Sequence, residues 1–108
     1  MSPTFNWVLK RTARMKEVRQ KLDHAAIRLA AREILDSTGP LSMFPVAKNE
    51  IPEAIAKSNP ARVNVHEGRV FIEYGDGHGH FGLQINSPGI PPPDGERIIE
   101  GVYYYEFE

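Results

Sequence analysis

The stretch from Trp7 to Asp36 contains neither glycine nor proline and is rich in residues that favour helices. It ends in the sequence DSTGP, where Gly39 can close a helix in the left-handed conformation and Pro40 cannot continue one. This pattern predicts one helix over residues 7–36, about 45 Å long at a rise of about 1.5 Å per residue. A compact chain of 108 residues is only roughly 27 Å across. The helix must therefore bend, project beyond the domain, or pack against a partner.

Apolar side chains form two stripes on this predicted helix. The first contains Met15, Val18, Leu22, Ala25, Ala26 and Leu29. The second contains Ile27, Ala30 and Ile34. Two stripes indicate two packing partners, so we expect the sheet of the same chain to cover one and a second copy or another protein to cover the other.

The rest of the chain changes from helical to alternating periodicity. Residues 52–58 are predicted to form a short helix, because Pro52 suits its first position and the sequence Asn59-Pro60 ends it. After Pro60 the sequence alternates between apolar and polar residues, which predicts strands over residues 62–108. The chain is therefore predicted to be a single α+β domain spanning residues 1–108, with both helices packed on a mostly antiparallel four-stranded meander.

The apolar alternation also predicts how the strands pair. A tight turn at Glu67-Gly68 places His66 opposite Arg69. A four-residue loop over residues 76–79 keeps the apolar residues of the next two strands on one face, which places Glu73 opposite Gly82. The proline-rich segment 87–96 is predicted to cross the surface in an extended form, and residues 101–108 to form the last strand.

The two ends of the chain carry opposite charge. Residues 1–21 contain six Lys and Arg residues against Glu17, whereas residues 67–108 contain eight acidic residues against two arginines. At helical spacing the predicted long helix presents one basic stripe, formed by Lys10, Arg14, Lys21, Arg28 and Arg32. Such a stripe could follow a nucleic-acid backbone or dock an acidic protein surface, including the acidic end of a second copy.

Histidine and acidic residues concentrate in the sequence EYGDGHGHFG. Imidazole and carboxylate groups are metal ligands, and the chain has no cysteine that could supply a thiolate. The candidate metal ligands are Glu73, Asp76, His78 and His80. The alternative interpretation is a hairpin turn, since glycines and Asp-Gly pairs are typical turn residues.

The last strand carries the second candidate contact surface. Tyr103, Tyr105 and Phe107 point to the face opposite Val102 and Tyr104, and tyrosine is enriched at protein interfaces. We therefore expect a protein partner at these residues.

Function follows from what the sequence contains and lacks. It has no long apolar run and no secretory leader, so no membrane contact and a cytoplasmic location are expected. It shows no catalytic motif and no cofactor-binding motif. It predicts a non-enzymatic interaction module, of accessory, inhibitor or immunity type, that forms a homodimer. The alternatives are a nucleic-acid-associated regulator using the basic stripe and a metal-binding protein using the loop at 76–80.

Overall fold

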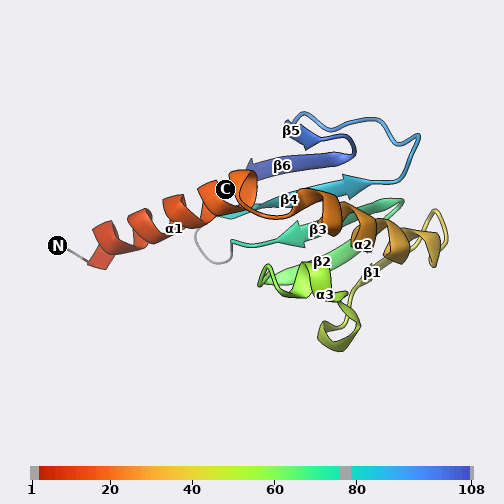
Figure 1. Ribbon diagram of the computed structural model, residues 1–108, viewed down its shortest axis with the longest axis horizontal. Coiled ribbons are helices and arrows are strands. Elements are labelled where there is room, and N and C mark those ends of the chain that lie inside the picture. Colours follow the sequence, from red (N-terminus) through yellow and green to blue (C-terminus); the bar gives the residue numbers. More distant parts are fainter. Residues whose placement is uncertain (1–2, 76–78, 108) are drawn as a thin grey trace.

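The computed structural model describes residues 3–75 and 79–107, with side chains from residue 8 onward. Within these ranges the chain forms three α-helices and a six-stranded antiparallel sheet (Figure 1). The helices are α1 (Pro3–Gln20), α2 (His24–Asp36) and α3 (Glu53–Ala56), with a short 3-10 helix at Lys48–Glu50. The strands are β1 (Met43–Pro45), β2 (Arg62–His66), β3 (Arg69–Glu73), β4 (His80–Asn86), β5 (Glu96–Ile99) and β6 (Val102–Phe107). The predicted α+β class is confirmed, and the prediction of four strands is wrong.

The strand order is β1-β2-β3-β4-β6-β5, so the first four strands form a meander and β6 lies between β4 and β5. The two strands that the sequence did not predict, β1 and β5, are the edges of the sheet. They contain three and four residues, which is too short to show a clear alternation. Pro45 in β1 is compatible with an edge position, where a missing N–H breaks no internal ladder.

The pairing predicted for the central hairpins is confirmed. His66 pairs with Arg69, and Glu73 pairs with Gly82 at the other end of β3. The backbone N–H of Tyr74 donates to Phe81 O at 2.9 Å, which continues this register toward the loop. Residues 76–78 themselves lie outside the described residues.

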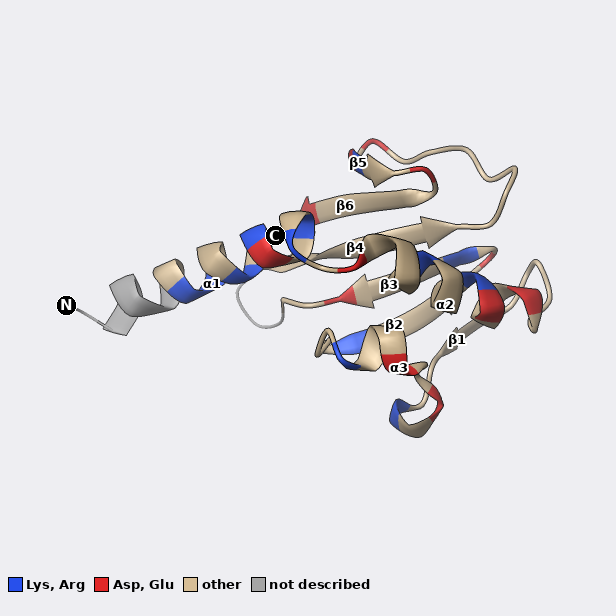
Figure 2. Ribbon diagram, viewed as in Figure 1, with Lys and Arg blue, Asp and Glu red and all other residues tan. Residues whose placement is uncertain are grey.

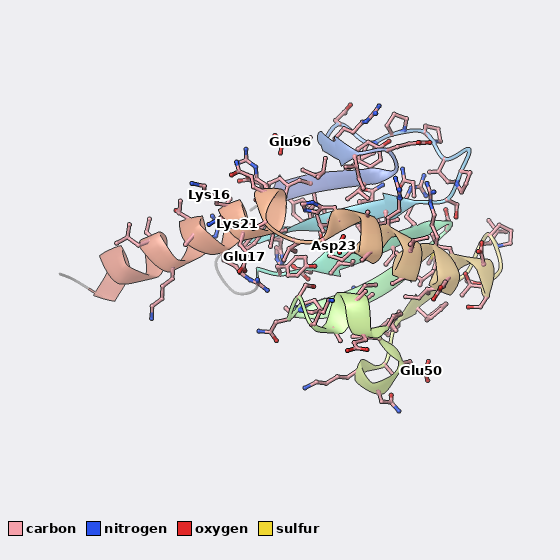
Figure 3. All side chains as sticks on the ribbon, in the orientation of Figure 1. Lys16, Glu17, Lys21, Asp23, Glu50 and Glu96 are labelled. Atoms are coloured by element: carbon pink, nitrogen blue, oxygen red, sulfur yellow. The ribbon has the colours of Figure 1, made fainter. Side chains whose placement is uncertain are left out.

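The prediction of one continuous helix over residues 7–36 is wrong. The chain leaves the helical path after Gln20, and α2 begins at His24 in a new direction (Figures 1 and 3). Asp23 caps α2, since its carboxylate accepts a hydrogen bond from the Ala26 N–H at 3.1 Å. An aspartate followed by a helical run is a start signal, but the good helix formers on both sides of it obscured that signal.

The break also changes which side chains are buried. Leu29, which a continuous helix would place in the first stripe, is exposed, whereas Ala31 and Leu35 of α2 are buried. Ile27 and Ala30 of the second stripe are buried, as a core position requires. The two stripes are therefore not two faces of one helix, because α1 and α2 meet the sheet separately.

Removal of the Asp23 cap gives a first testable prediction. Asp23→Ala is expected to lower the free energy of unfolding by about 1 kcal/mol, because an N–H at the start of α2 loses its acceptor. Urea denaturation measures the change. Asp36→Ala, at the last residue of the same helix, is the control and should not destabilise, since an acidic residue at that end opposes the helix dipole. Equal losses in both variants would contradict the capping role.

The core lies between the three helices and one face of the sheet, here called the inner face. Val18 of α1, Ile27 of α2 and Ile55 of α3 are almost completely buried there. They pack with the inward side chains of the strands, which are Val63, Val65, Val70, Ile72, Phe81, Leu83, Ile85, Val102 and Tyr104. None of the described helices covers the opposite face, here called the outer face.

The first turns of α1 extend beyond the sheet. Figure 1 shows the helix running away from the other elements toward the N-terminus, and the molecule is 49 Å long against 29 and 23 Å in the other directions. A single helix over residues 7–36 was expected to bend, project or pack against a partner. The structure divides this segment into α1 and α2, and α1 projects beyond the sheet. No helix within the described residues is both long and apolar enough to cross a membrane.

Candidate functional site

Five aromatic rings form a continuous line across the outer face, here called the aromatic row. Its members are His66, Phe71, Tyr105, Phe107 and His80. The Tyr105 and Phe107 rings are stacked, with centroids 5.4 Å apart and planes 17° apart. Phe71 meets Tyr105 edge-on at 6.1 Å, and His80 lies 5.7 Å from Phe107. Phe107 remains 60% exposed, so the row is open to a binding partner.

The row is continuous because one strand lacks a side chain where the rings cross it. Gly82 of β4 pairs with Tyr105 on one side and with Glu73 on the other. A Cβ atom at position 82 would lie 2.8 Å from the Tyr105 hydroxyl oxygen and would also meet the Ile72 carbonyl. The phenol therefore lies across β4 in the space that this glycine leaves open.

A charged cluster lies beside the aromatic row. The Glu73 carboxylate forms an ion pair with Arg62 Nε, at 2.8 Å, and its other oxygen contacts His80 Nδ1. The Glu73 side chain is only 12% exposed, and each of its carboxylate oxygens contacts one of these two partners. The pair of Glu73 and His80 orients the imidazole ring next to Phe107.

The structure brings together two of the four predicted metal ligands. Glu73 and His80 are in contact, whereas Asp76 and His78 lie outside the described residues. In the described part of the chain, no three His, Asp or Glu residues are placed to share a metal ion. The metal site at this loop therefore stays a prediction.

The environment of Tyr105 favours its neutral form. Burial raises the pKa of Tyr105 above its ordinary value, and the nearby Glu73 carboxylate and Tyr74 raise it further, against the opposing charge of Arg62. The Tyr105 phenol therefore keeps its proton and can donate a hydrogen bond at neutral pH.

A groove of about 580 Å³ runs alongside the row at the end of β6. Phe71, Gln84, Tyr105 and Phe107 line it from the outer face. Pro93, Asp94, Gly95 and Glu96 form a wall, and Arg19, Tyr104 and Glu106 line its far side. The groove therefore combines aromatic surface with three carboxylates.

One polar atom at this groove has no partner inside the described chain. The Tyr104 hydroxyl is buried and makes no hydrogen bond with any described residue. Burial and the neighbouring Glu106 carboxylate raise the pKa of Tyr104, so the hydroxyl keeps its proton. Arg19 lies over the Tyr104 ring at 5.4 Å and pairs with Glu96 at 3.1 Å, which ties α1 to β5 at the rim.

The structure divides the predicted basic stripe. Lys10, Arg14 and Lys21 belong to α1 or its end, whereas Arg28 and Arg32 belong to α2, so the five cations do not share one helical face (Figure 2). The prediction of a single stripe assumed the continuous helix and is wrong for the same reason as that helix.

Two arginines of the stripe hold the fold together. Arg14 donates to the carbonyl oxygens of Ser58 and Asn59, at 2.6 and 2.9 Å, and its guanidinium lies 5.0 Å from the centre of the Tyr74 ring. Arg28 donates to the Glu100 carbonyl oxygen at 2.9 Å. These contacts join α1 to the end of α3 and α2 to the β5–β6 turn, which explains the two arginines structurally.

Arg32, Lys10 and Lys21 complete the predicted set. Arg32 lies against Gly101, where an added Cβ would be 2.6 Å from its Nη2 atom. Lys10 and Lys21 are exposed, at different positions along α1 and its end (Figure 3 labels Lys21). Lys10 and Lys21 stay exposed on α1 and its end, so the nucleic-acid alternative stays a prediction.

Sequence reasoning identified Tyr105, Phe107 and His80 but missed three parts of the site. The alternation of β3 directs Phe71 outward, but it does not show that Phe71 joins His66 to Tyr105 in the aromatic row. The role of Gly82 could have been found from its predicted position opposite Glu73. The groove wall at 93–96 had no signal beyond its proline content, because its position depends on β5.

Comparisons of the chain with protein-family models, with curated proteins and with solved structures found no match.

Proposed function

We propose that this chain is a small, non-enzymatic protein-interaction module that docks a protein partner on the outer face of its sheet. The observation that carries the proposal is the aromatic row, in which Tyr105 and Phe107 stack and Phe107 stays 60% exposed. Aromatic residues supply most of the binding energy at many protein interfaces, because they bury large areas at low entropic cost. An accessory, inhibitor or immunity-type role agrees with a domain that carries a binding face and no catalytic constellation in its described part.

The chemistry of the groove indicates what kind of segment binds. Asp94, Glu96 and Glu106 line the groove, and Arg19 pairs with Glu96 at its rim. Aromatic faces attract cations, and carboxylates at a rim steer them. The expected partner segment therefore combines lysine or arginine with apolar side chains that reach the aromatic row.

A displayed library of random peptides tests this proposal, because it samples partner segments of every composition. The wild-type chain is expected to select peptides with Lys or Arg beside apolar residues. Phe107→Ser should reduce binding of the selected peptides at least about tenfold, because an exposed aromatic anchor is lost. Affinity is measured by isothermal calorimetry with the full chain.

Leu29→Ser is a matched control, since Leu29 is 65% exposed but lies in α2, on the helix side of the sheet and away from the outer face. It should bind the selected peptides as the wild-type chain does. Equal binding by the wild-type chain and both variants, or the selection of no peptide, would exclude docking at this face.

A further inference from the structure

We propose that the segment docked in the groove is the N-terminal arm of a second copy of this chain, exchanged reciprocally between two protomers. The arm is residues 3–10, the part of α1 that extends beyond the sheet. This inference rests on the proposed docking function and names the occupant of the same groove.

The arm has the features of a segment that binds elsewhere. Val8 and Leu9 are 44% and 48% exposed, and Arg11 lies 5.5 Å from the centre of the Phe81 ring, where α1 meets the sheet. A helical segment of eight residues is marginal in water without tertiary contacts. Its sequence, TFNWVLK over residues 4–10, joins apolar and aromatic residues to a lysine, which is the composition that the groove favours.

The arm cannot reach the groove of its own chain. Arg14 fastens the middle of α1 to Ser58, and Val18 is completely buried beneath it. Arg19 lines the groove, and Leu9 lies ten residues earlier, about 15 Å away along a straight helix. Figure 1 shows the helix continuing away from the sheet over this length. Docking of the arm must therefore occur between molecules.

The charges favour docking of the arm in the groove over packing of one arm against another. Two arms packed against each other would bring the Lys and Arg residues of 10–16 close together, which is unfavourable. In the groove, exposed Lys10 would meet the carboxylates of Asp94 and Glu106 instead.

A reciprocal exchange is geometrically consistent with two-fold symmetry. The groove and the root of the arm lie at the same end of the molecule, since an added Cβ at Gly79 would be 2.8 Å from Arg11 and 3.8 Å from the Phe107 carbonyl oxygen. Two protomers related by a two-fold axis at this end can each give an arm and receive one. The exchange buries two arms and two grooves. The total buried area is therefore twice that of one arm in one groove, which helps it reach the roughly 1,200 Å² of a stable interface.

Sedimentation equilibrium of the full chain tests the exchange. The wild-type chain is expected to form a dimer. Leu9→Glu should raise the dimer dissociation constant at least about tenfold, because it replaces an exposed apolar side chain of the arm with a carboxylate. Leu41→Glu, at an exposed leucine outside the arm and groove, is the control and should leave the constant unchanged.

A charge exchange identifies the receiving surface. Lys10→Glu and Glu106→Lys should each raise the dissociation constant about fivefold, and the double variant should return it to within about twofold of wild type. Failure of the double variant to recover would overturn the pairing of arm with groove.

The two proposals can fail separately. A wild-type chain that is monomeric at every concentration would overturn the arm exchange, as would a Leu9→Glu variant that dimerises like wild type. The peptide selection with Phe107→Ser judges docking at the outer face independently. Phe107-dependent peptide binding by a monomeric chain would thus leave the docking function standing without the exchange.

Discussion

Gly82→Ala is expected to lower the free energy of unfolding by about 3 kcal/mol or more. The added methyl group would meet the Ile72 carbonyl oxygen and lie 2.8 Å from the Tyr105 hydroxyl oxygen. The backbone of β3 is held by pairing on both sides and cannot move away, so the cost exceeds that of ordinary overpacking. Urea denaturation followed by circular dichroism measures the change.

Gly39→Ala is the matched control for this substitution. Gly39 is not in the left-handed conformation that the sequence predicted for it, and a Cβ there would meet Ser42 Oγ at 3.4 Å, an ordinary contact, so stability should change by less than about 0.5 kcal/mol. A loss below about 1 kcal/mol in Gly82→Ala would mean that Tyr105 and β3 adjust freely. In that case the aromatic row would not be held in the position that the docking proposal requires.

The second large effect is expected at alkaline pH. Burial raises the pKa of Tyr74 from 10.0 to about 12, although its hydrogen bond with Ser58 and the charge of Arg14 oppose the shift. A folded-state pKa above the unfolded value means that the folded chain binds the proton more tightly. The stabilisation is therefore complete below about pH 10 and is lost as the pH rises from 10 to 12. The loss from this group alone is about 3 kcal/mol.

Urea denaturation at pH 8, 10, 11 and 12 measures this loss, and Tyr74→Phe is the control. The variant has no phenol to ionise at position 74, and Ser58 Oγ still donates to the Ile55 carbonyl oxygen at 2.6 Å. Its free energy of unfolding should fall less steeply above pH 10 than that of the wild-type chain. The pKa values of Tyr104 and Tyr105 are also raised, so their ionisation lowers the free energy of unfolding of the wild-type chain and of the variant alike. Identical slopes would show that Tyr74 ionises as readily in the folded chain as in the unfolded one.

The central hairpins were predictable residue by residue. The alternation of residues 62–66 and 69–74 permits one register that keeps the aliphatic side chains of both strands on the inner face, and the structure has that register. A shift of one residue would expose a whole row of core side chains to water. The sequence alone therefore shows that any other pairing of these strands would be unfavourable.

The helical region was predictable in content but not in path. Helix formers from Trp7 to Asp36 predict helix correctly, yet the chain changes direction around Asp23, because α1 and α2 must each lay a short apolar face on a curved sheet. The same break moved Leu29 to the surface and separated the predicted basic stripe. Local propensity favours a continuous helix, and the gain from burying Ile27 and Leu35 on the sheet outweighs it.

The candidate site was also predictable from the sequence only in part. The outward direction of Tyr105 and Phe107 follows from alternation alone, and so does the position of Gly82 opposite Glu73. The stacking of Tyr105 on Phe107, the contacts of Glu73 and the groove depend on which strand lies beside β4. That neighbour is β6, the last strand of the chain, and not the one that follows β4 in sequence.

The amino-acid pattern of this chain thus determined the directions of its strand side chains and the opposite charges of its ends. Both properties depend on neighbours a few residues apart, where covalent geometry leaves little choice. The tertiary structure alone decided the end of α1 at Gln20, the edge strands β1 and β5, and the union of the aromatic row with an acidic groove. Those features join residues far apart in sequence, and they exist because burial of the inner face brings distant segments together.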